Sequence, residues 1–265
     1  MRTIMNILLA TMICSDITAQ NSFSKLWDYR YGGRGNDECI ALHETADGGF
    51  LLSGNSFSTQ GYDISDTSRG GLDFWIVKLN KNGEKEWDKR YGGGGHDFAN
   101  RAVNARGGGY LIAGQSASGM TGDKSQPSRG GYDYWVVRID EQGNKLWDRR
   151  FGSTGSDHLW ALATTLDGGY ILGGWSVGNA GGDKSENNHG ADEDFWVVKI
   201  DSMGNLQWDK TIGTSGTDFM TCVLATQDGG YLLGGESWAY LDGDKTDTVY
   251  GGYDCWVVKL DSSGQ

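Results

Sequence analysis

Apolar and polar residues follow the same order in four successive stretches of this chain. In the second stretch, residues 134–137 place large apolar side chains on both faces of a strand, which is typical of a strand covered on both sides. Residues 87–91 alternate instead, so Asp88 and Arg90 share the face opposite Trp87. Charges on an outermost strand protect an exposed sheet edge. The pattern predicts short β-strands and shows no helix signal.

The pattern has a fixed period, which two sets of tryptophans mark. The first set is Trp27, Trp87, Trp147 and Trp208, at steps of 60, 60 and 61 residues, and the second is Trp75, Trp135, Trp196 and Trp256. A fixed period indicates one supersecondary unit whose copies bury their apolar surfaces against one another. We therefore expect these periodic tryptophans in the core.

Each repeat is predicted to hold four strands. In the second repeat they span residues 98–105, 110–115, 133–140 and 145–151. The glycine-containing links between the first two and the last two strands are short enough to be tight hairpins. The strands thus form an antiparallel meander. Such units repeated radially are the blades of a β-propeller, so the predicted fold class is all-β.

The two ends of the chain suggest how such a ring closes. The fourth repeat stops in the turn at 261–265 without its last strand, whereas residues 24–31 form a last strand with no repeat before them. We expect residues 24–31 to pair with the strand at 254–260 and to close a four-bladed propeller. The alternative is a fragment of a larger propeller that is broken off within a repeat.

The first nineteen residues lie outside the repeats. Arg2 precedes an apolar stretch at 4–14, and Ala19 provides a small residue before a cleavage site, as in a secretory signal peptide. The expected domains are therefore a signal peptide at 1–19 and a β-propeller at 20–265. The mature chain is expected to be exported without inserting into a membrane.

Export places the chain in an oxidising compartment, where structural cysteines are usually paired. Cys39, Cys222 and Cys255 remain after cleavage, and other repeats carry ordinary residues at their positions. We expect them to be small core residues. A disulfide between Cys222 and Cys255 is the alternative.

Composition excludes one class of partner. The net charge of −12 argues against nucleic acid, because that affinity depends on Lys and Arg neutralising phosphates. The same charge disfavours anionic membrane surfaces. The 44 glycines and the single proline fit many short strands joined by tight turns.

Catalytic motifs find little support. Residues 174–178 match a nucleophile-elbow pattern, but Gly-x-Ser ends the second strand of every repeat and no helix follows it. The histidines occupy unrelated repeat positions without metal-ligand spacing, and we expect them to be solvated or locally hydrogen-bonded. They are His43, His96, His158 and His189.

Calcium is the one cofactor worth weighing. An Asp-x-Ser/Thr motif recurs in the long loops, and Ca²⁺ prefers six to eight oxygen ligands. The same residues brace loops through side-chain turns, and lysines within the motif oppose a cation. We therefore expect no cofactor, with calcium at Asp242, Asp244 and Asp247 as the alternative.

Residues that break the repeat indicate the candidate ligand site. Trp160, Trp175 and Trp238 stand where other repeats have Asn100, Gln115 and Ala117. Strand connectivity brings the long links to one side of a propeller, where binding usually occurs. The predicted ligand-binding residues on this side are Trp160, Trp175, Trp238, Tyr240, Asp157, Asp183 and Asp244. Packing that compensates for unequal loops is the other explanation for the three tryptophans.

The combined motif resembles a known type of repeat. Residues 87–93, Gly108-Gly109-Tyr110, residues 122–125 and residues 133–137 are similar to the delta-60-like propeller repeats of secreted proteins from Gram-negative bacteria. This resemblance covers residues 24–265. It implies a location outside the cytoplasm, extracellular, on the cell surface or in the periplasm, often through type IX secretion. The C-terminal sorting domain of such proteins is not in this sequence, and the family implies no general activity.

Three function classes follow from the sequence. The leading prediction is a secreted or cell-surface binding or adhesion module for a glycan or a surface protein, not an enzyme. A purely structural repeat region of a larger exported protein is the first alternative. An enzyme is the second: the stretch 139–147 weakly resembles the tryptophan-docking repeat of quinoprotein propellers, but the adjacent cysteine pair of those dehydrogenases is missing.

Overall fold

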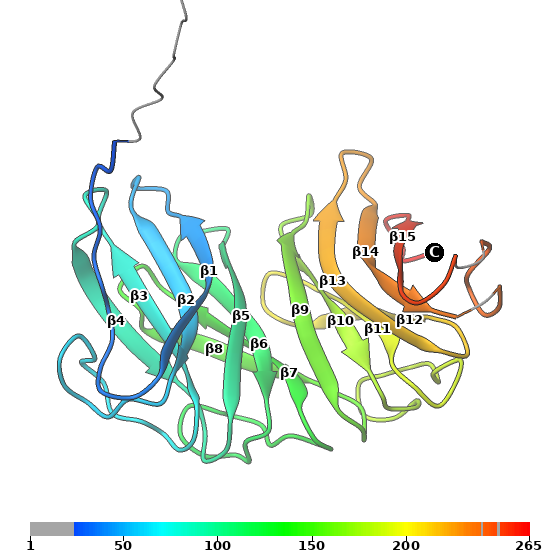
Figure 1. Ribbon diagram of the computed structural model, residues 1–265, viewed down its shortest axis with the longest axis horizontal. Coiled ribbons are helices and arrows are strands. Elements are labelled where there is room, and N and C mark those ends of the chain that lie inside the picture. Colours follow the sequence, from blue (N-terminus) through cyan, green and yellow to red (C-terminus); the bar gives the residue numbers. More distant parts are fainter. Residues whose placement is uncertain (1–23, 240, 248–249) are drawn as a thin grey trace, which may run out of the picture.

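The computed structural model describes residues 24–239, 241–247 and 250–265. Within them the chain forms fifteen β-strands in four antiparallel sheets (Figure 1). The predicted signal peptide and Tyr240 lie outside the described residues. In the described part, no helix is long and apolar enough to cross a membrane.

The strands follow one another along the chain in each sheet, so the predicted meander is confirmed. The first sheet contains β1 (Asp37–Glu44), β2 (Phe50–Ser56), β3 (Asp73–Leu79) and β4 (Lys85–Tyr91). The second contains β5 (Asp97–Asn104), β6 (Tyr110–Ser116), β7 (Asp133–Ile139) and β8 (Lys145–Phe151). The third contains β9 (Asp157–Thr164), β10 (Tyr170–Ser176), β11 (Asp194–Ile200) and β12 (Leu206–Ile212). The fourth contains only β13 (Thr217–Ala225), β14 (Tyr231–Trp238) and β15 (Asp254–Leu260).

Successive sheets pack face to face through three apolar clusters. At each of the three junctions, one aromatic side chain meets a tryptophan of the next sheet. The pairs are Phe74 with Trp135, Tyr134 with Trp196, and Phe195 with Trp256, at ring-centroid distances of 4.8, 4.7 and 5.0 Å. We call the side of a sheet that faces the next sheet along the chain its forward face, and the opposite side its rear face. This arrangement is consistent with a β-propeller-like repeat protein.

The two sets of tryptophans are not equally buried. Those of the third strand, Trp75, Trp135 and Trp196, are in the core as predicted, whereas Trp87, Trp147 and Trp208 of the outer strand are half-buried. The prediction of a core position was wrong for this outer-strand set, whose first member, Trp27, is 41% exposed, and for Trp256 of the fourth sheet, which is half-buried. Each of these outer-strand rings packs on a glycine in the last turn of the following sheet. The pairs are Trp87 with Gly143, Trp147 with Gly204 and Trp208 with Gly264.

Gly143 illustrates why that hairpin needs a glycine. Its φ of +79° is in the left-handed region, and a Cβ there would come within 3.1 Å of the Trp87 ring. The hydroxyl of Tyr91 donates to the carbonyl of the same glycine. The outer strand β4 thus contacts the second sheet through the Trp87 ring and the hydrogen bond of Tyr91.

The charges of the outer strand do not protect an edge, which corrects the interpretation of Asp88 and Arg90. Both side chains are buried. Asp88 accepts hydrogen bonds from the indole N–H of Trp75 at 3.1 Å and from the backbone N–H of Ser65 at 2.9 Å. The carboxylate thus ties the outer strand to its neighbour and to the long loop, and Asp148 and Asp209 repeat the arrangement.

The cysteines are also placed differently from expectation. Cys39, Cys222 and Cys255 are free and exposed, so neither the core position nor the disulfide is found. Cys39 and Cys255 belong to the two sheets at the ends of the array, whose outer sides have no neighbouring sheet in the described chain.

Residues 24–31 form no strand with β15, whose pairing is with β14 alone. They lie beside the first sheet, at the other end of the array from the fourth (Figure 1). Trp27 covers Gly83, and the Tyr31 hydroxyl donates to the carbonyl of that residue. Closure of the ring therefore stays a prediction, and the observed architecture is an open row of four sheets.

Candidate binding face

The long connections gather at one end of the strands. Within each sheet the first two strands, and in the first three sheets the last two, are joined by five-residue turns, such as residues 105–109 and 140–144. The links between the second and third strands are much longer, for example residues 117–132. Because neighbouring strands are antiparallel, these long links share one side with the connections between sheets. We call this the long-loop side.

A row of aromatic rings crosses all four sheets on this side. Neighbouring ring centroids in the row are 3.9–6.3 Å apart. In order, the row consists of Phe57, His96, Phe98, Tyr132, His158, Trp175, Phe219, Tyr253 and Trp238. We call it the aromatic row.

The row is exposed at its ends and packed in its middle. Phe57 and Trp238, the terminal members, are 53% and 57% exposed. Trp175 is half-buried, stacked on His158 with ring centroids 3.9 Å apart and edge-on to Phe219 at 5.2 Å. The two ends thus offer free aromatic surface, and the centre provides a rigid support.

The predicted tryptophans divide between these environments. Trp238 is exposed, at the end of β14, beside Tyr253. Trp175 is a half-buried, packed member of the row. Trp160 is 38% exposed and is the fourth residue of β9. It stands at a β-bulge, where pairing shifts between Leu159 and Ala161.

The predicted acidic residues mainly brace the loops. Asp157 is buried and accepts hydrogen bonds from the backbone N–H and the hydroxyl of Ser153. Asp183 pairs with Arg129 at 2.9 Å and Arg150 at 3.1 Å. Asp244 accepts from the backbone N–H of Gly213 at 3.1 Å. Their use by a ligand stays a prediction.

The calcium alternative gains no further ligands. Asp242 accepts the backbone N–H of Ser215 at 3.0 Å and also bonds its hydroxyl, and Asp244 lies 2.9 Å from Nε2 of His189. Asp247 belongs to the same long loop. Over residues 24–239, 241–247 and 250–265, no group of three or more His, Cys, Asp or Glu side chains is placed to hold a metal ion.

Sequence reasoning missed most members of the aromatic row. It treated His96 and His158 as solvated or locally hydrogen-bonded. Nδ1 of His96 does accept the backbone N–H of Leu72, but His158 stacks on Trp175. The available signal was the residue after the recurring aspartate of the first strand, which carries a ring in three of the four repeats: Phe98, His158 and Phe219.

Burial changes the proton affinity of several groups on this side. The pKa of His158 falls from 6.5 to about 4 because burial disfavours its charged form. Burial, with a smaller contribution from the charge of Asp157, raises the pKa of Asp133 to about 7. Burial lowers the pKa of Lys124 to about 8.

Each repeat buries a positively charged side chain near its buried carboxylates, but the residue that supplies this charge differs between repeats. Lys124, Lys184 and Lys245 occupy one loop position in three repeats, and all three are buried. In the first repeat, this position holds Ile64. In that repeat Arg90 supplies the buried positive charge. It donates to the Ser56 hydroxyl and the Ser58 carbonyl and lies 3.7 Å from Asp73.

A small pocket adjoins the Trp238 end of the row. Its volume is about 300 Å³, and its lining includes Trp238, Asp192, Asp242 and Ser215. Carboxylates next to an exposed indole offer hydrogen-bond acceptors beside an apolar surface. Such a combination suits a ligand that carries hydroxyl groups on an apolar frame.

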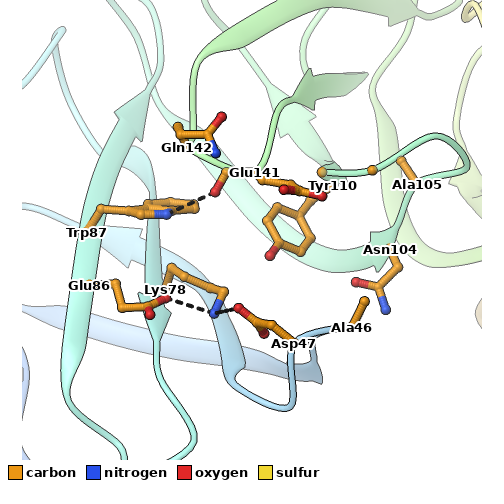
Figure 2. Close-up of a pocket in the computed structure, with 12 residues that line it drawn as sticks. Ala46, Asp47, Lys78, Glu86, Trp87, Asn104, Ala105, Tyr110, Glu141 and Gln142 are labelled. Carbon is orange, nitrogen blue, oxygen red and sulfur yellow. Dashed lines mark hydrogen bonds and ion pairs between the residues drawn. The ribbon is translucent and has the colours of Figure 1, made fainter.

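A larger pocket, about 640 Å³, lies instead among the short hairpins, between the first and second sheets (Figure 2). Its charged groups are paired: the ammonium of Lys78 binds Asp47 at 2.8 Å and Glu86 at 2.9 Å. At the next junction the Arg106 side chain lies beside Gly168, whereas the shorter Ala46 stands at the corresponding position here.

The sequence matches no protein-family model. It is 25% identical over 161 residues to the regulatory protein FlaEY of Caulobacter vibrioides, covering 58% of this chain and 17% of that protein. The chain thus spans about a sixth of its relative. A Bacteroides caccae protein of unknown function gives a TM-score of 0.41 at 13% identity, over 74% of this chain and 53% of that one.

Proposed function

We propose that this chain is a secreted or cell-surface binding module whose long-loop side holds a glycan. The aromatic row is the observation that carries the proposal. Rings that continue across four sheets, with free surface at Phe57 and Trp238, suit an extended ligand rather than a small enclosed one. A surface protein is the other ligand class that such a row suits, because aromatic residues are enriched at protein interfaces.

The pocket beside Trp238 supports a glycan in particular. Asp192 and Asp242 line this pocket together with Trp238. Sugar hydroxyls donate hydrogen bonds to carboxylate oxygens, while the apolar face of the sugar covers the indole. The net charge of −12 agrees with a neutral or cationic ligand.

We further propose that the four sheets are blades of a β-propeller whose last blade is completed by a strand formed from residues 24–31. Each of the first three sheets has an outer strand, whereas the fourth has three strands. The role proposed for this scaffold is binding, not catalysis. A purely structural role predicts that the protein retains no ligand at all.

The test compares the wild type with Trp238→Ala on a glycan array and in a pull-down of surface proteins. Leu146→Ala is the matched control, because Leu146 is also 57% exposed and lies outside the aromatic row. We expect Trp238→Ala to lose glycans that both other proteins retain. Loss of a protein partner alone would assign the row to protein binding, and equal retention by all three would reject the site.

A further inference from the structure

The three junctions between sheets are built alike, and the outer side of the fourth sheet lacks the same partner. Val136 and Val197, on the forward faces of the second and third sheets, are fully buried. The equivalent Val257 is 55% exposed. Leu232 is 36% exposed, whereas the equivalent Leu111 is fully buried. The forward face of the fourth sheet is therefore an apolar surface of the kind that the other sheets bury.

The fourth sheet also lacks a hydrogen bond that the first three sheets share. The indole N–H groups of Trp75, Trp135 and Trp196 each donate to an aspartate of the outer strand at 3.0–3.1 Å. Trp256 is the equivalent residue of the fourth sheet. In the described part of the chain, its indole N–H has no such acceptor.

Residues 24–31 already have the position of an outer strand, but relative to the first sheet. Trp27 lies on Gly83 as Trp87 lies on Gly143, and Lys25 pairs with Asp28 at 2.9 Å as Lys85 pairs with Asp88. The segment thus sits against the rear face of the first sheet as β4 sits against that of the second. In the described part of the chain, this segment belongs to none of the four sheets.

We propose that the fourth sheet of one copy packs on the first sheet of a second copy, whose residues 24–31 supply the missing strand. In this assembly Asp28 of the second copy accepts the indole N–H of Trp256, and Trp75 covers Cys255. This inference rests on the proposed completion of the last blade and adds the source of the strand.

Residues 24–31 of a second copy fit the edge of β15 better than the same residues of the chain itself. Residues 24–31 lie at the opposite end of the row from β15, so pairing within one chain requires the row to bend round (Figure 1). Docking of a second copy leaves the contacts of Trp27 and Tyr31 with Gly83 in place. The contact is heterologous, and such contacts repeated between two copies close a ring. Four sheets from each copy give eight, within the range of known propellers.

The first test is the mass of the purified protein by analytical ultracentrifugation over a range of concentrations. We expect a species of two copies that dissociates on dilution. Val257→Asp places a charge in the new junction and should shift the protein to one copy. Leu146→Asp, at a site of similar exposure outside the junction, should leave the mass unchanged. A single-copy mass for the wild type at all concentrations would overturn the proposal.

The second test locates the strand by a disulfide. In the first sheet Phe74 pairs with Tyr91 across β3 and β4. Cys255 is the equivalent of Phe74, and Tyr31 is the equivalent of Tyr91. Tyr31→Cys, with Cys39 and Cys222 replaced by Ser, should therefore cross-link to Cys255 between two copies. Tyr29→Cys is two positions out of register, too far for a disulfide, and should not cross-link.

The outcomes separate the two proposals. A disulfide within a single copy would show closure by the chain's own segment and would overturn the role of a second copy. Ligand binding is read from Trp238→Ala, whose site lies on the long-loop side. A two-copy mass without any ligand would therefore count against the binding function alone.

Discussion

The imidazole of His158 and the indole of Trp175 are stacked, with ring centroids 3.9 Å apart and an interplanar angle of 26°. The two residues come from neighbouring strands, β9 and β10, and face each other in register. Burial lowers the pKa of His158 to about 4, so the stacked ring is neutral at physiological pH. The centre of the aromatic row thus depends on a histidine that remains uncharged.

This pKa predicts a loss of stability in acid. Between pH 6.5 and 4 the unfolded chain binds a proton at His158 that the folded chain does not, so the free energy of unfolding falls as pH falls. His158→Phe should remove this loss and keep the ring, because Phe98 and Phe219 occupy the equivalent positions. Melting temperatures at pH 7 and 4.5 provide the measurement. An equal fall in both proteins would contradict the assignment.

Trp175 and Trp238 should differ in their effect on stability. Trp175→Ala removes a half-buried ring between His158 and Phe219, and we expect a loss of about 2–3 kcal/mol, below the ~3–5 kcal/mol of a fully buried tryptophan. Trp238→Ala changes an exposed ring, and we expect a change within about 0.5 kcal/mol. Urea unfolding followed by circular dichroism distinguishes the two. A large loss for Trp238→Ala would make it a packing residue.

Local patterns determined which parts of this structure the sequence could predict. The strands of the second repeat were placed within one residue of β5 to β8, because two-residue alternation and glycine turns are properties of adjacent residues. The sequence showed that the Trp-Asp pair recurs, but it did not show which contact the aspartate makes. Asp148 meets Trp135 across two strands, and only their register brings the carboxylate to the indole.

The aromatic row escaped prediction because its contacts cross between sheets. Tyr132 meets His158, and Trp175 meets Phe219, although these rings stand at different positions of the repeat. Alignment of equivalent residues identifies departures such as Trp175, but not rings that become neighbours through packing. The exposure of Cys255 could not be predicted for a related reason: in the described chain no sheet covers the outer side of the fourth sheet, and this does not depend on the residue itself.

Asp133 should give a pH dependence of opposite sign to that of His158. Its pKa is about 7 in the fold against 3.8 in the unfolded chain, so between pH 4 and 7 the folded state holds a proton that the unfolded state has lost. The free energy of unfolding therefore decreases as pH rises through this window. Asp133→Asn should remove that decrease.

The melting temperature of Asp133→Asn minus that of the wild type should thus increase from pH 4 to 7 and level off above it. Asp194→Asn is the matched variant, because burial raises the pKa of Asp194 to about 6. Its effect should have the same sign and level off nearer pH 6. A difference that does not vary with pH would mean that neither carboxyl group titrates in this window.

The two buried arginines of the outer strands should not be equally dispensable. Arg90 is the buried cation beside Asp73, in the repeat where Ile64 replaces the loop lysine. Arg90→Thr leaves buried carboxylates without that cation, and we expect a loss of about 3–5 kcal/mol, as when one partner of a buried ion pair is removed. Arg150→Thr should cost less, because Lys124 remains and the third sheet already carries Thr211 at this position. Urea unfolding of both variants is the measurement. Equal losses would show that the loop lysine does not substitute for the arginine, whereas rescue of Arg90→Thr by Ile64→Lys would establish that either residue supplies the same buried charge.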